Sequence, residues 1–75
     1  MFALVVVDIK AVTIETDYFE TELECQNALM RDIYENYQDL ILPVCFDRVR
    51  IDSWFAENEI NVIWAIDEVK LTPKR

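Results

Sequence analysis

Two stretches near the start of the chain have the hydrophobic pattern of β-strands. Residues 2–9 are dominated by valine, leucine and isoleucine, and a short β-branched run of this kind predicts a buried strand at the centre of a sheet. Residues 11–19 alternate with a period of two, and Glu15 and Asp17 share the polar side, which predicts a half-exposed strand with an acidic face. Lys10 and Ala11 mark a tight reversal between the two strands. Because this reversal has no glycine and no Asn-Gly pair, one continuous, bent strand is an alternative.

A helix is predicted after the second stretch. Thr21 and Glu24 have the spacing of a capping box, in which the hydroxyl and the carboxylate each satisfy a free backbone N–H group of the first turn. We place the helix at residues 22–38, because Pro43 lacks a backbone donor and restricts the residue before it. One broad arc of this helix is apolar and is expected to face the sheet. Its members are Leu23, Cys25, Leu29, Met30, Ile33, Tyr34 and Tyr37.

Residues 44–51 predict a third strand. Cys45, Val49 and Ile51 share one parity, and Arg48 and Arg50 have the other, so the polar face of this strand would be basic. These arginines can pair with the acidic residues of the second strand across the sheet or bind carboxylates of a partner. The internal pairing is the simpler account.

The last third of the chain continues with a short helical turn and a strand. Asp52 or Ser53 can cap a single turn around Trp54 that ends at the turn-prone Asn58. Residues 60–66 then alternate as a strand does, and we expect this strand to fray after Asp67 into a charged tail over residues 68–75.

These elements predict an α+β fold in one small domain over residues 1–75. The expected architecture is a small antiparallel sheet of about four strands with one main helix on one face, in the order strand, strand, helix, strand, strand. One helix covers only one face, yet Trp54, Phe55, Ile63 and Trp64 supply more apolar surface than that face accepts. Either the segment near Trp54 folds over the second face, or a second molecule covers it.

Composition and charge exclude several classes of function. The 75 residues are 53% hydrophobic and 29% charged, which suits a small folded domain. Fifteen acidic and seven basic residues leave a net charge of −8, which opposes direct binding to nucleic acid or anionic lipid. The chain has no glycine and no histidine, which excludes phosphate-binding loops, Gly-flanked serine elbows and histidine-based triads. We therefore expect no enzymatic activity and no cofactor.

Membrane and metal partners are not expected either. No apolar run approaches the roughly 20 residues of a membrane span, so a cytoplasmic location is expected. Cys25 and Cys45 without histidine make a poor metal site. The two cysteines can form a disulfide if the helix packs on the third strand, but without a secretion signal we favour two reduced, buried thiols.

Acidic residues are concentrated in a ten-residue stretch without lysine or arginine, which contains Glu15, Asp17, Glu20, Glu22 and Glu24. Alternate strand residues are about 6.6 Å apart, so a row of such carboxylates can present the charge pattern of a nucleic-acid strand. The simpler alternative is a solvated strand face followed by acids that suit the positive end of a helix.

The aromatic side chains are candidates for both the core and an interface. Tyrosine and tryptophan anchor protein interfaces because they bury a large area at a small cost in entropy. We expect Tyr37, Phe55 and Trp64 in the core. Trp54, which follows Asp52 and Ser53 in an expected loop, is the best candidate for an anchor.

The chain resembles a family of small uncharacterised proteins of enterobacteria and their prophages in three segments: Met1–Val5, Thr21–Cys25 and Leu42–Cys45. The resemblance covers about the first 45 residues in scattered pieces. It implies a bacterial or phage accessory gene, a context in which small acidic proteins often obstruct a larger host machine. It implies no activity.

The sequence therefore predicts a non-enzymatic, acidic protein-binding module similar to phage-encoded inhibitors. Its expected partner is a host defence or DNA-processing protein with a basic surface, which it would occupy by nucleic-acid mimicry. The alternative is a homo-oligomeric structural or accessory protein, for instance a homodimer, whose apolar sheet face is covered by self-association.

Overall fold

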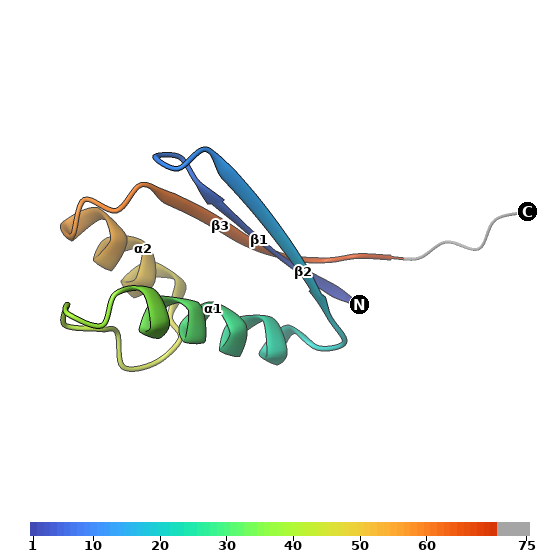
Figure 1. Cartoon of the computed structure of the whole chain (residues 1–75). Helices are drawn as coiled ribbons and strands as arrows, with labels where there is room; N and C mark the ends of the chain where they lie inside the picture. Colours follow the sequence, from blue (N-terminus) through green and yellow to red (C-terminus); the bar gives the residue numbers. More distant parts are fainter. Residues whose placement is uncertain (71–75) are drawn as a thin grey trace, which may run out of the picture.

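The computed structural model describes residues 1–70 and has an α+β architecture (Figure 1). In chain order the elements are β1 (Phe2–Asp8), β2 (Thr13–Phe19), α1 (Glu22–Asn36), α2 (Arg48–Glu57) and β3 (Val62–Glu68). The antiparallel sheet has three strands in the order β2-β1-β3. The α+β class is confirmed, whereas the predicted four strands and single main helix are wrong.

The first run of valines forms the central strand, as predicted. β1 pairs with β2 and with β3 along its whole length. Leu4 lies opposite Asp17 on one side and Ile66 on the other. Since paired residues of neighbouring strands point to the same face, this register determines which side chains of the two edge strands face the helices.

The reversal between β1 and β2 is a hairpin, and the alternative of one bent strand is wrong. Val12 takes the place of the missing glycine with a φ of 56°, a left-handed conformation that is unusual for a β-branched residue. The backbone N–H of Ala11 donates to Oδ1 of Asp8 at 3.0 Å. This hydrogen bond helps to hold the turn.

The capping box of α1 is confirmed. The Glu24 N–H donates to Oγ1 of Thr21 at 3.2 Å, and the Thr21 N–H donates to Oε1 of Glu24 at 3.1 Å. The helix ends at Asn36, earlier than the predicted Gln38, with Tyr37 as its C-cap. The buried face is narrower than the predicted arc and consists of Cys25, Leu29 and Ile33, whereas Leu23 and Tyr34 are exposed.

The predicted strand over residues 44–51 is wrong, because α2 occupies its second half. The carboxylate of Asp47 accepts from the Arg50 N–H at 3.1 Å and caps this helix, in place of the predicted Asp52 or Ser53. Ile51 and Phe55 are buried, and their spacing of one helical turn places both on one side. Asn58 ends the helix as predicted.

β3 is the predicted late strand, and its pairing extends past Asp67. Glu68 belongs to the strand, and the Val69 N–H donates to the carbonyl oxygen of Met1 at 2.8 Å. The predicted tail over residues 68–75 is therefore wrong at its start. The rest of that prediction, residues 71–75, lies outside the described part of the chain.

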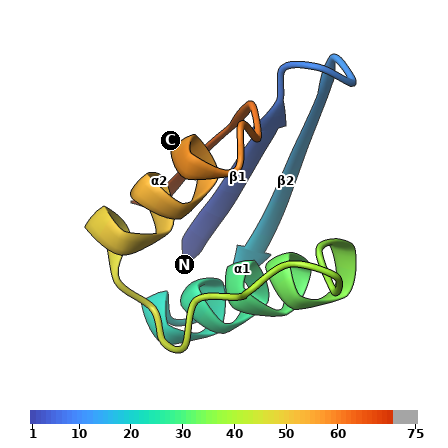
Figure 2. The same ribbon diagram turned by 90° about the vertical axis from the view of Figure 1, so that its left-hand side faces the viewer.

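Both helices pack on one side of the sheet, as Figures 1 and 2 show. The core on that side joins all elements except β2 through buried side chains: Leu4, Cys25, Leu29, Ile33, Ile51, Phe55 and Trp64. The indole N–H of Trp64 donates to Oδ1 of Asp52 at 2.8 Å. Because α2 lies on the same side as α1, the segment around Trp54 does not cover the second face of the sheet.

Candidate functional site

β2 carries its acidic side chains on the helix side of the sheet. Glu15 lies opposite Val6 and Asp17 lies opposite Leu4, and both partners belong to the side that packs against the helices. The apolar parity, Ile14 and Tyr18, therefore points to the uncovered face. Every residue from Thr13 to Tyr18 is exposed, so the carboxylates of this edge strand stay in contact with water.

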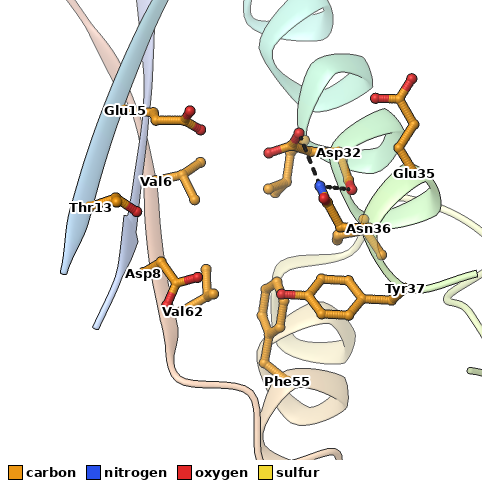
Figure 3. Close-up of a pocket in the computed structure, with 12 residues that line it drawn as sticks. Val6, Asp8, Thr13, Glu15, Asp32, Glu35, Asn36, Tyr37, Phe55 and Val62 are labelled. Atoms are coloured by element: carbon orange, nitrogen blue, oxygen red, sulfur yellow. Dashed lines mark hydrogen bonds between the residues drawn. The ribbon is translucent and has the colours of Figure 1, made fainter. Parts of the chain in front are cut away.

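An acidic groove separates β2 from α1. Two adjoining hollows of about 430 Å³ and 300 Å³ form it, and both are lined by Val6, Glu15, Asp32 and Glu35. The first extends to Asp8 and the second to Asp17. In Figure 3 the Glu15 carboxylate on the strand side faces Asp32 on the helix. We use the term acidic groove for this depression and its carboxylates, Asp8, Glu15, Asp17, Asp32 and Glu35.

The floor of the acidic groove is apolar. Val6 of β1, Leu29 and Ile33 of α1 and Phe55 of α2 line the larger hollow. Three of these four, all except Val6, belong to the buried core. The acidic groove therefore combines a rigid apolar base with carboxylates along its rims, which suits a ligand that has both apolar surface and positive charge.

The negative charges of the acidic groove affect the pKa of Tyr37, which lines one end of the groove. Burial raises the pKa of the Tyr37 phenol above its ordinary value, and the charges of Asp8 and Asp32 raise it further. None of the side-chain hydrogen bonds within residues 1–70 uses a lysine or arginine side chain. Arg31 is the basic residue among the lining residues, and it is exposed.

The structure divides the predicted acidic residues into two groups. Glu15 and Asp17 belong to the acidic groove, whereas Glu20, Glu22 and Glu24 are exposed at the corner between β2 and α1. Glu24 is engaged in the capping box, where its Oε1 also accepts from the Thr21 hydroxyl at 3.1 Å.

The corner acids also affect a buried thiol. Burial raises the pKa of the Cys25 thiol above its ordinary value, and Glu24 and Glu22 add to this effect. Both cysteines are free thiols, but only Cys25 is buried, and Cys45 is exposed. The prediction of two buried thiols is therefore wrong for Cys45, because the strand on which it was placed does not form.

Sequence reasoning missed three carboxylates of the acidic groove, Asp8, Asp32 and Glu35. The hairpin register was the available signal for Asp8, because it places this residue opposite Thr13, on the same side as Glu15. Asp32 and Glu35 are three residues apart in α1 and so lie on one helix face. Glu35 is outside the apolar arc predicted for this helix, and only the tertiary position of β2 beside α1 brings it into the acidic groove.

Trp54 does not line the acidic groove. It lies in α2 and not in a loop, which corrects its predicted setting, and its indole N–H donates to the Ile41 carbonyl at 2.6 Å. Its ring packs edge-on against Tyr37 with centroids 5.5 Å apart. It lines a separate hollow beside Val44 and Cys45, so the structure does not unite it with Glu15 and Asp17.

The predicted pairing of Arg48 and Arg50 with Glu15 and Asp17 is wrong. Both arginines lie in α2, and the Arg48 guanidinium stacks on the Trp64 ring at 4.5 Å from its centroid. This cation–π contact keeps Arg48 on the β3 side of the molecule. Within residues 1–70, neither of these arginines therefore engages the carboxylates of the acidic groove.

The carboxylates do not converge on a point. Within residues 1–70, no three acidic or cysteine side chains group as the ligands of a metal ion would. In the same part of the chain, none of the helices has the length and apolarity needed to cross a bilayer.

Comparisons with known proteins give no relative. The chain matches no protein-family model, no curated protein and no solved structure.

Proposed function

We propose that this protein is a non-enzymatic binding module that holds a basic segment of another protein in its acidic groove. The supporting observation is that carboxylates from β1, β2 and α1 line one groove with an apolar floor. Such a groove attracts lysine and arginine side chains, whose charged ends pair with the rims while their aliphatic stems lie on the floor. It repels phosphate groups.

The partner that we propose is a host defence or DNA-processing protein in the bacterial cytoplasm. Proteins of this kind expose clustered lysine and arginine side chains because they bind phosphate backbones. A chain with a net charge of −8 is drawn to such a surface from a distance, and its association slows as salt screens the field. Occupation of the surface would compete with nucleic acid, as an inhibitor encoded by a phage or mobile element does.

Capture from bacterial lysate at low and high salt tests this function. We expect the parent chain to retain a basic protein at low salt and to release it at high salt. The Glu15→Lys/Asp17→Lys variant should lose this protein, because the reversed charges repel its lysine and arginine side chains. The retained protein is then purified, and its binding to nucleic acid is measured with and without the parent chain.

A matched variant separates the acidic groove from net charge. Glu57→Lys/Glu68→Lys changes the net charge by the same amount at exposed positions outside the groove, and we expect it to keep most of the binding. Equal loss in both variants would show that only total charge matters. Unchanged capture by Glu15→Lys/Asp17→Lys would refute the proposed role of the acidic groove.

A second candidate function is that of a self-associating structural or accessory protein. The observation that favours it is the uncovered sheet face, where Ile14 and Ile63 are 72% and 59% exposed. Val7 lies between them in the register. An apolar sheet face without a cover is a common site of subunit contact, and a second copy could bury this one.

A further inference from the structure

β2 is a sheet edge with open hydrogen-bonding capacity. It pairs with β1 alone, and the other side of the strand faces no further strand within residues 1–70 (Figure 2). In an edge strand, alternate residues direct their backbone N–H and C=O groups away from the sheet. An extended segment of another protein can therefore add to β2 as a fourth strand.

The side chains of β2 specify which segment fits. An added strand would point alternate side chains to the groove side, next to Glu15 and Asp17, and the others to the open face, next to Ile14 and Tyr18. Opposite charges on neighbouring strands stabilise the pairing, and apolar neighbours do the same on the other face. We infer that β2 takes up an extended protein segment in which lysine or arginine alternates with apolar residues.

This inference rests on the proposed function and makes its partner more specific. The acidic groove alone would accept any basic segment, whereas the β2 edge selects one with a period of two and a free backbone. The other edge, β3, places Trp64 and Ile66 on the helix side and has a carboxylate there at its last residue, Glu68, so it lacks the adjacent pair of carboxylates that β2 offers to a basic segment.

The same pattern disfavours a second copy of this chain at the β2 edge. When two β2 strands pair antiparallel with their apolar sides on one face, the registers with the largest overlap put Glu15 opposite Asp17, Glu15 opposite Glu15 or Asp17 opposite Asp17. Like charges in directly opposite positions destabilise strand pairing. The edge is therefore closed to self-pairing and open to a segment of opposite charge.

Titration with synthetic peptides tests the inference on the full-length, isotope-labelled chain. The probe alternates lysine and valine over about nine residues, which is enough to span the seven residues of β2. In NMR spectra we expect the backbone amide resonances of β2 to shift when the peptide is added and those of β3 to remain unchanged. The Glu15→Gln/Asp17→Asn variant should bind the probe about fivefold more weakly, whereas Glu57→Gln/Glu68→Gln should bind it as the parent does.

Three control peptides distinguish strand addition from simple charge attraction. One has the same composition with lysines and valines in separate blocks. The other two carry N-methyl groups on all lysines or on all valines, which blocks opposite edges of an extended peptide. We expect the block peptide to bind about tenfold more weakly, and one N-methyl peptide to lose binding while the other retains it.

The outcomes separate this inference from the proposed function. Equal binding of the alternating, block and both N-methyl peptides would overturn strand addition and leave the acidic groove as a binding site for basic segments. Failure of the alternating peptide to bind would also overturn strand addition, and the capture experiment with the groove variants would then decide the proposed function on its own.

Discussion

The two faces of the sheet differ most at β2. On the helix side, β1 and β3 supply the core residues Leu4 and Trp64, whereas β2 supplies Glu15 and Asp17. On the open side, β2 supplies the exposed Ile14 and Tyr18. The acidic side of β2 thus faces the protein and its apolar side faces solvent, which is the reverse of an ordinary amphipathic edge strand.

This reversal supports the proposed role of β2 in binding, because its acidic side adds little to the core. A hydrophobic side turned to water and an acidic side turned to an apolar floor both reduce stability in the isolated chain. Local choices that conflict with stability are concentrated at functional sites. We therefore expect different effects from changes in the core, at the buried Cys25 thiol and on the open side of the sheet.

The largest expected effect is on the core side. Leu29 is 1% exposed and belongs to the core between the two helices and the sheet. Leu29→Ala leaves a cavity there and should lower the free energy of unfolding by about 3 kcal/mol, as measured by urea denaturation followed by tryptophan fluorescence. The control is Leu23→Ala in the same helix, because Leu23 is 62% exposed and its loss should cost about 0.5 kcal/mol or less. Similar losses in both variants would contradict the placement of the core.

An intermediate effect is expected at alkaline pH on the helix side. Burial raises the pKa of the Cys25 thiol above its ordinary value of 9.0, with Glu24 and Glu22 contributing. The folded chain therefore keeps a proton that the unfolded chain releases, so the free energy of unfolding should fall as pH rises above that value. Denaturation curves at a series of pH values measure this slope.

Two cysteine variants show which thiol causes the fall in the free energy of unfolding at alkaline pH. Cys25→Ala should lower stability at neutral pH and make the slope shallower, because the group with the raised pKa is gone. Tyr37, whose pKa is also raised by burial, should supply the slope that remains. Cys45→Ala should leave the slope as in the parent chain, since that thiol is exposed. If the Cys25→Ala variant lost stability with pH as steeply as the parent chain, the assignment of the slope to Cys25 would be refuted.

The smallest effect on folding is expected on the open side. Ile14→Thr/Ile63→Thr keeps β-branched residues in both strands and should change the free energy of unfolding of the monomer by about 0.5 kcal/mol or less. Its effect on association is the informative one. If the second candidate function holds, sedimentation will show a concentration-dependent dimer of the parent chain that this variant lacks. A monomer at all concentrations would remove that candidate.

Local sequence signals predicted much of the fold. The capping box located the start of α1 because Thr21 and Glu24 need only each other, and the valine run predicted β1 at the centre of the sheet. The first part of α2 was missed because Arg48, Val49, Arg50 and Ile51 alternate in polarity as a strand does. The competing signals, the Asp47 cap and the pair of Ile51 and Phe55, are local too and outweigh the alternation once Phe55 meets the core.

The candidate site was only partly predictable. The composition indicated an acidic binding surface and included Glu15 and Asp17, but Asp32 and Glu35 join them only because α1 crosses beside β2. Trp54 was predicted to be an anchor for the partner because an exposed loop was expected there. In the folded chain its indole donates to the Ile41 carbonyl and packs on Tyr37, and Trp54 lines a separate hollow and not the acidic groove.

By itself, the sequence determined the helix start, the central strand, the net negative charge and the lack of glycine and histidine, since these depend on near neighbours or on composition. Only the tertiary structure decided which face of the sheet the helices cover, and hence which parity of β2 meets them. That choice is a property of the whole core. It buries Leu4 and Trp64, which lie on the same side as Glu15 and Asp17, and so it leaves the apolar side of β2 in solvent.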